Sequence, residues 1–313
     1  MSDWRGEVLD FLLCQFTQAL EKHKMLQAGK LAGQWAAVLS LAALQGLLPA
    51  VAQVAPSTQG AKLGPAGAPA QAGPSVLERV RGSGVLRVCI WPDYYGVTYR
   101  DPRNQQFAGI DIELSAELAR DLKVKLQYVE SSFVQLIADV TGERCDVAMF
   151  AIGVLPQRKE HLSFSQPYLR SDIYGVASRT SRSVREWADI DKPGVVVAVQ
   201  AGTFMEPVMA AALKNARMTV VKPPATREQE LESGRVDVFM TDYPYSRRLL
   251  ENADWAKLIA PPQPFYTLPY AYAVKPGDAA WLARVDEFVA AIKRDGRLAA
   301  AAKRHGLSAI VVN

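Results

Sequence analysis

Residues 84–122, GVLRVCIWPDYYGVTYRDPRNQQFAGIDIELSAELARDL, join a short apolar run to a longer amphipathic one. The run 84–91 is rich in β-branched residues and predicts a buried strand. The run 109–122 places Leu114, Leu118 and Leu122 on one face of a helix. Downstream, we expect a strand at 125–130, a helix at 133–142 and a second buried strand at 145–153. Strands that alternate with helices in this way predict a parallel sheet covered on both faces.

The same pattern starts again at residue 194. We expect strands at 194–200, 218–224 and 235–242, helices at 206–216 and 227–234, and a helical tail at 278–306 that breaks near Gly296. Two αβ units of similar size predict two lobes with a cleft between them. Ligands of open α/β sheets lie beyond the carboxyl ends of the strands, which here means the residues that follow Trp91, Phe150, Gln200 and Asp242. No glycine-rich phosphate loop follows these strands, so we expect no nucleotide cofactor.

Composition excludes several classes of protein. The chain has 313 residues, of which 49% are hydrophobic, so it is not disordered throughout. A net charge of +4 is too small for a dedicated nucleic-acid binder. Three cysteines and three histidines stand at no metal-ligand spacing, and we expect no metal site. No Ser-His-Asp or Cys-His arrangement is readable.

The N-terminal quarter has the composition of a targeting segment followed by a spacer. Residues 31–61 contain no charged side chain, lysines precede them, and Ala50-Val51-Ala52 forms a small-x-small site. This pattern predicts a signal peptide cleaved after Ala52; an uncleaved membrane anchor is the alternative. Residues 1–24 are too long for an ordinary n-region, so they are either a short helix or upstream of a true start at Met25. Residues 53–75 are rich in Ala, Pro and Gly and predict a linker.

Four segments resemble bacterial solute-binding proteins of family 3, the periplasmic receptors of amino-acid ABC importers. They are GIDIELSAELARDL (109–122), LPQRKEHLSFSQPYL (155–169), AVQAGT (198–203) and VDVFMTDYP (236–244). They occur in the order of the family. The resemblance implies an α/β, two-lobe periplasmic-binding-protein-like (type II) fold, each lobe a mostly parallel sheet flanked by helices, with a hinge between the lobes. It places lobe one at 78–175 plus 271–313 and lobe two at 176–270.

The resemblance also implies a function. We expect a periplasmic, monomeric receptor without cofactor or enzymatic activity, which closes over a small carboxylate-bearing solute and delivers it to the permease of an ABC transporter. A receptor that serves a membrane sensor is an open alternative.

Site residues are carried over position by position. Arg158 matches the family arginine that holds the α-carboxylate, and Asp242 matches the aspartate that takes the ammonium, although it could instead form an Asx turn before Pro244. Thr203 is either part of an anion site or only an N-cap. The aromatic candidates are Trp91, Tyr94, Phe133, Phe150 and Phe204.

This sequence departs from the amino-acid receptors of the family in its hydrogen-bonding residues. Phe150, Ala151, Gly153, Leu155 and Phe204 stand where small hydroxyl residues are common. We therefore expect a less polar pocket, and an aromatic or otherwise apolar acid as the solute.

Two further interpretations concern single residues. Residues 189–206 and the stretch 261–265 resemble cyclohexadienyl dehydratases, lyases of the same fold, in which Glu206 would match the general acid. Cys89 and Cys145 fall at opposite parts of two expected buried strands, so we expect a free buried pair rather than a disulfide.

Overall fold

The computed structural model describes residues 74–313. The expected signal peptide, its cleavage site after Ala52 and nearly all of the expected linker lie outside these residues. Within the described residues, no helix is long and apolar enough to cross a membrane.

The first sheet contains six strands. Its order is β4 (Lys125–Glu130), β1 (Val85–Ile90), β5 (Val147–Gly153), β13 (Leu268–Val274) and β6 (Ser163–Phe164), and β7 (Leu169–Ser171) also pairs with β13. β1 runs parallel to both of its neighbours, whereas β13 is antiparallel to its three partners. β5 is buried along its whole length, as expected for a central strand covered on both faces.

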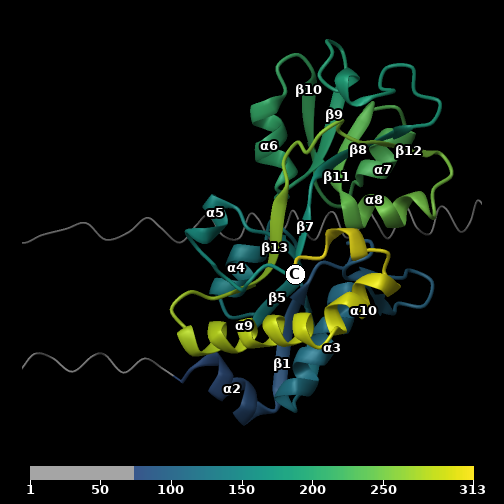
Figure 1. Ribbon diagram of the computed structural model, residues 1–313. Coiled ribbons are helices and arrows are strands. Elements are labelled where there is room, and N and C mark those ends of the chain that lie inside the picture. The colour runs from purple at the N-terminus through teal and green to yellow at the C-terminus, as the bar shows by residue number, and fades with distance from the viewer. Residues whose placement is uncertain (1–73) are drawn as a thin grey trace, which may run out of the picture. The chain divides into compact units, whose positions relative to one another are not determined.

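Helices from the first third and from the end of the described chain belong to this lobe. They are α2 (Val76–Ser83), α3 (Ile110–Leu122), α4 (Leu136–Thr141), α5 (Pro156–Lys159), α9 (Ala279–Arg294) and α10 (Arg297–Arg304). α9 packs on β13, and α2 and α10 pack against α9 (Figure 1). The helical tail breaks at Gly296, as expected. A small hairpin, β2 (Tyr99–Arg100) with β3 (Phe107–Ala108), and the 3-10 turn η2 (Ser308–Ile310) complete this lobe.

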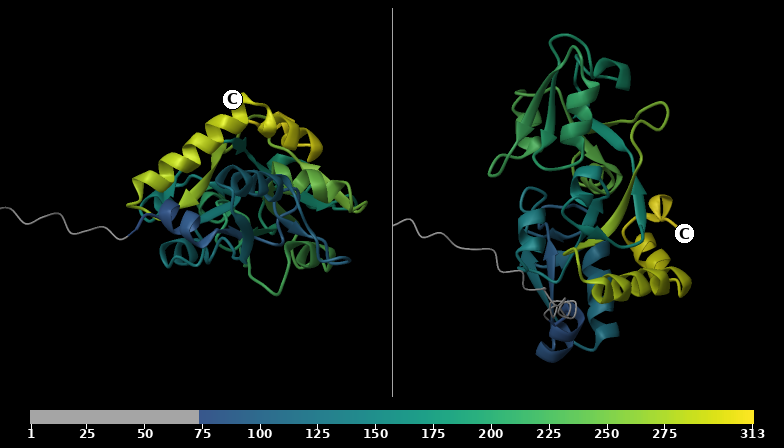
Figure 2. Two further views of the ribbon diagram at one scale, coloured as in Figure 1. Left: turned by 90° about the horizontal axis from the view of Figure 1, so that it is seen from below. Right: turned by 90° about the vertical axis from the view of Figure 1, so that its left-hand side faces the viewer.

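The second sheet contains five strands in the order β10 (Arg217–Val221), β9 (Val196–Gln200), β11 (Val238–Asp242), β8 (Ile173–Ser178) and β12 (Ala256–Ile259). The first three strands are parallel, β8 pairs with β11 in antiparallel fashion, and β12 pairs with β8 in antiparallel fashion. Its helices are α6 (Met205–Ala212), α7 (Arg227–Glu232) and α8 (Tyr243–Leu250), with the 3-10 turn η1 (Trp187–Asp189). Figure 2 shows the two sheets in separate lobes. The α/β two-lobe expectation is confirmed.

Two connections join the lobes. The chain leaves the first sheet after β7 and enters the second at β8, so Asp172 is the residue between them. It returns between β12 and β13. The Asp172 carboxylate accepts hydrogen bonds from both connections, from the amide of Ile173 at 2.7 Å and from those of Phe265 and Tyr266 at 2.8 and 2.7 Å. One side chain therefore ties the outgoing and the returning segment together.

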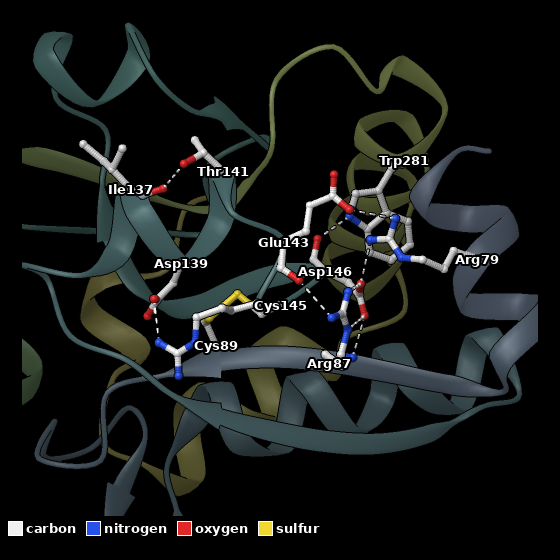
Figure 3. The surroundings of a disulfide bond; sticks show 11 residues. Arg79, Arg87, Cys89, Ile137, Asp139, Thr141, Glu143, Cys145, Asp146 and Trp281 are labelled. Atoms are coloured by element: carbon white, nitrogen blue, oxygen red, sulfur yellow. Dashed lines mark hydrogen bonds and ion pairs between the residues drawn. A yellow bond between two sulfur atoms is a disulfide. The ribbon is translucent and has the colours of Figure 1, made fainter. Parts of the chain in front are cut away.

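A disulfide joins Cys89 to Cys145, so the expectation of a free pair was wrong. Cys145 lies in the turn before β5 and outside that strand, which begins at Val147 and not at 145 as expected. The Asp146 carboxylate beside it accepts from the backbone amide of Arg87 at 2.7 Å and from its guanidinium at 2.6 Å (Figure 3). These bonds draw the turn against β1, which leaves the two Cα atoms 5.5 Å apart.

Candidate functional site

The carboxyl end of β5 is fixed by Asp111, the acidic residue of the segment 109–122. Its carboxylate accepts hydrogen bonds from the amide of Ala151 at 2.9 Å and from the hydroxyls of Tyr168 and Tyr272 at 2.5 and 3.2 Å. Ala151 has a φ of 47°, a left-handed conformation that is costly for alanine. Because Ala151 lines the cavity described below, Asp111 acts on the site through the backbone.

Burial raises the pKa of Asp111 to about 6, and its three hydrogen bonds oppose that rise. The folded state thus binds a proton more tightly than the unfolded state, so this group contributes stability at low pH that is lost as the pH rises from about 4 to about 6. Relative to an Asp111→Asn variant, we expect the wild type to lose up to about 3 kcal/mol of unfolding free energy across this window. Urea unfolding at pH 4 to 7 measures the difference. Parallel profiles for the two proteins would show that Asp111 does not titrate there.

A small cavity lies between residues of the two lobes. It measures about 20 Å³, enough for one water molecule. Six of the eight expected ligand-binding residues line it: Trp91, Tyr94, Phe133, Thr203, Phe204 and Asp242. The other lining residues are Ala151, Met205, Arg227, Thr241 and Tyr245. A wider cleft of about 760 Å³ shares Trp91 and Phe133 with the cavity and continues to the surface.

The aromatic residues of lobe one form one cluster at the cavity. The ring centroids of Trp91 and Phe133 lie 5.3 Å apart, and Tyr94 lies 5.3 Å from Trp91 and 5.9 Å from Phe133. Phe150, an expected site residue, does not line the cavity. It packs edge-on against Phe133 at 5.1 Å and supports that ring from behind.

Asp242 sits at the end of β11 with its hydrogen-bonding capacity largely used. Its Oδ2 accepts from the hydroxyls of Tyr94 and Tyr270, the latter at 2.6 Å, and its Oδ1 accepts from the amide of Tyr245 at 3.2 Å. The last bond caps α8. Burial raises the pKa of the Asp242 carboxyl, and the hydrogen bonds from Tyr270 and Tyr94 oppose the rise. Because Tyr94 and Tyr270 belong to lobe one, this carboxylate also bridges the lobes.

Arg158 does not line the cavity but bridges the lobes beside it. Its guanidinium donates to the carbonyl of Gly153 in lobe one at 2.9 Å and to that of Gly202 in lobe two at 2.8 Å, and it lies 5.2 Å from the Phe133 ring centroid. The residue is only 6% exposed, and burial lowers the pKa of its guanidinium to about 10. At neutral pH it is therefore a buried cation.

Thr203, just before α6, was expected either to form part of an anion site or to serve only as an N-cap. Thr203 donates its hydroxyl to the carbonyl of Gln200 at 2.8 Å, and Phe204 occupies the N-cap position, so the N-cap interpretation of Thr203 was wrong. Glu206 does not line the cavity. Its carboxylate accepts from the amide of Gly202 at 2.7 Å, in the turn that leads into α6.

Sequence reasoning missed Arg227, Tyr245 and Tyr270. Arg227 opens α7, and its charge and neighbours gave it the pattern of a solvated helix face. The signal that could have found it is the register of α7, since Arg227 and Leu231 are four residues apart and both are buried. Within residues 74–313, no group of acidic, histidine or cysteine side chains could hold a metal ion.

A model of the bacterial extracellular solute-binding proteins, family 3, matches residues 86–308, and the chain belongs to this family. It is 34% identical to a cyclohexadienyl dehydratase of Pseudomonas aeruginosa over 236 residues, 74% of this chain and 87% of that protein. It is 23% identical to the L-cystine-binding protein TcyJ of Escherichia coli, over 73% of this chain and 85% of that protein.

Solved structures give the same fold. The crystal structure of AncCDT-1, described as an ancestral amino acid-binding protein and a precursor of cyclohexadienyl dehydratase, has a TM-score of 0.68 and 28% identity, and covers 74% of this chain and 99% of that one. The solute receptor for L-cysteine of Neisseria gonorrhoeae has a TM-score of 0.70 and 21% identity, and covers 77% of this chain and all of its own. Family and fold thus define a solute-binding protein of type II architecture.

Proposed function

We propose that this protein is a receptor that closes its two lobes over a small carboxylate-bearing solute with an aromatic or apolar body. The observation that carries the proposal is Arg158, a buried cation at the junction of the lobes. Two backbone carbonyls are its hydrogen-bond partners among the described residues, and neither is charged.

A buried cation without a counter-charge is costly, and a ligand carboxylate would offset that cost. The planar guanidinium matches a carboxylate in two parallel hydrogen bonds. The carboxylate would take the place of the Gly202 carbonyl as acceptor of the Arg158 guanidinium. The neighbouring rings of Trp91, Tyr94 and Phe133 then offer an apolar surface for the rest of the solute.

The size of the cavity favours hinge closure. A cavity of about 20 Å³ holds no solute of this class. Entry therefore requires that the lobes separate, and the Tyr94–Asp242 and Arg158–Gly202 bonds are among those that must break. We infer that the solute exchanges these bonds for its own and so selects a closed form.

The test is a thermal-shift screen of the purified protein. The panel contains the twenty amino acids, benzoate, phenylacetate, 3-phenylpropionate and prephenate. A ligand at a hundred times its Kd stabilises the folded state by about 2.7 kcal/mol, which is a readable shift. We expect Arg158→Gln to weaken the binding of the responding acid by about 10- to 100-fold. Arg217→Gln, on the exposed end of β10, is the matched control. An acid that binds both variants equally would contradict the role of Arg158.

A dehydratase is the second candidate, favoured by the 34% identity to cyclohexadienyl dehydratase. Glu206 would be its general acid, although in this closed arrangement its carboxylate is bonded to Gly202. The assay is the appearance of phenylpyruvate from prephenate in the presence of the protein. Turnover that disappears in Glu206→Gln would replace the receptor proposal, whereas binding without turnover supports it.

We place the protein in the periplasm, where it would serve an ABC permease or, alternatively, a membrane sensor. A buried disulfide supports an oxidising compartment. The family description as extracellular agrees with this location.

A further inference from the structure

A second cavity, which we call the seam cavity, lies where α8 of lobe two meets the end of α10 of lobe one (Figure 1). It measures about 390 Å³ and shares no lining residue with the inter-lobe cavity or with the wider cleft beside it. Lobe two contributes Arg248 and Glu251, and lobe one contributes Lys303, Arg304 and His305 together with residues around the β2–β3 hairpin. The seam cavity is therefore separate from the solute site.

The two lobes approach each other closely at the seam cavity. An added Cβ at Gly96 of lobe one would lie 3.3 Å from the carbonyl oxygen of Pro244 in lobe two. One at Gly306 of lobe one would lie 3.9 Å from the Nε of Arg247 in lobe two. Because both lobes form its wall, the seam cavity is complete only when they are together.

The ion pairs at the seam cavity stay within one lobe. Arg248 pairs with Glu251 at 2.7 Å in lobe two, and Arg304 donates to Glu113 at 2.9 Å in lobe one. Among residues 74–313, no ion pair joins the two lobes, and Lys303 has no ion-pair partner. Electrostatic attraction between side chains therefore does not hold the lobes together at this point.

The charges at the seam cavity are predominantly positive. With His305 neutral, four basic side chains stand against two carboxylates, which leaves an excess of two positive charges; they are Arg247, Arg248, Lys303 and Arg304 against Glu113 and Glu251. The negative ends of α8 and α10 offset part of this excess. Basic groups of the two lobes thus face each other, and their repulsion opposes closure.

We propose that the seam cavity binds a small dianionic oxyanion of the phosphate type, and that this anion favours the closed form. Its oxygens would accept hydrogen bonds from basic side chains of both lobes and replace their repulsion by attraction to a shared partner. An anion that binds the closed form better than the open form shifts the population toward closure. By linkage, the anion and the solute then raise each other's affinity.

Isothermal titration of the purified protein with inorganic phosphate tests the anion site. The titration is made at about pH 8, where phosphate is largely a dianion, with sodium chloride keeping the ionic strength constant. We expect the double variant Arg248→Gln/Lys303→Gln to bind phosphate at least about 10-fold more weakly than the wild type, since two charge-assisted contacts are lost.

The matched control is Arg217→Gln/Lys125→Gln. It also removes one exposed arginine from lobe two and one exposed lysine from lobe one, but neither residue lines the seam cavity. This control should bind phosphate like the wild type. A wild type that binds no phosphate, or equal weakening in the two double variants, would overturn the anion site. Phosphate binding that disappears in Arg158→Gln would assign the ion to the solute site and overturn it as well.

The coupling to closure rests on the proposed receptor function, whereas the anion site does not. Saturating phosphate should raise the affinity of the wild type for the responding acid by about 5-fold or more over chloride at equal ionic strength. The effect should vanish in Arg248→Gln/Lys303→Gln and persist in the control. Phosphate binding without any rise in solute affinity would overturn the coupling and leave the receptor function standing. If no acid of the panel binds, the receptor proposal fails, and the phosphate titration decides the anion site by itself.

Discussion

A Gly202→Ala variant is expected to bind its solute at least about 100-fold more weakly than the wild type, which corresponds to about 3 kcal/mol. Gly202 belongs to lobe two, and its backbone meets lobe one. A Cβ at this position would lie 2.7 Å from the amide nitrogen of Val134 and 2.8 Å from the carbonyl carbon of Phe133. Backbone atoms cannot move aside as a flexible side chain can, so the lobes would stop short of closure.

The control for this variant is Gly194→Ala. Both glycines have left-handed φ values, 74° and 87°, so alanine brings the same backbone cost of about 1–2 kcal/mol at either position. At Gly194 the added Cβ would meet no atom within 4 Å. Small-angle scattering with the responding acid should show compaction for Gly194→Ala and little for Gly202→Ala. Equal compaction and equal affinity in the two variants would show that Gly202 does not limit closure.

Loss of the disulfide should lower the free energy of unfolding by about 4 kcal/mol, from the chain entropy of a loop closed by residues 56 apart. The bond joins β1 to the turn before β5, within the lobe whose strand ends carry Trp91 and Ala151. Urea unfolding of the double variant Cys89→Ala/Cys145→Ala, beside the wild type with and without reductant, measures the effect. The reduced wild type should approach the variant, and the variant should not respond to reductant. Equal midpoints in a sample whose free thiols have been titrated would refute the estimate.

The alternation of strands and helices was readable from the sequence because each segment carries its own periodicity. The apolar residues of the helix 109–122 repeat with the helical period, and the strand 145–153 contains the continuous apolar run of a strand buried on both faces. α8 was missed because Tyr243-Pro244 has the pattern of a turn. Proline is also favoured in the first turn of a helix, and Asp242 supplies the cap.

The features that could not be predicted from the sequence depend on contacts between segments that are distant in the chain. The antiparallel strands β8, β12 and β13 take their direction from partners far away in the chain. The Cys89–Cys145 pairing depends on how the turn at Asp146 folds against β1, which no local pattern encodes. Six of the residues that line the cavity were predicted because they follow strand ends or match a family segment. Arg227 does neither, and the packing of α7 against β9 and β11 brings it to the cavity.

The three hydrogen bonds on Asp172 also bear on how the lobes separate. Two independent linkers would allow twisting, sliding and tilting, and an open state of that kind would have a large conformational entropy. Because the single carboxylate of Asp172 holds the outgoing and the returning segment, the two segments should bend together. We therefore expect opening to be a rotation about one axis, with few configurations to lose on closure. A solute can therefore select the closed form with a modest number of contacts, because little of its binding free energy goes into restoring order.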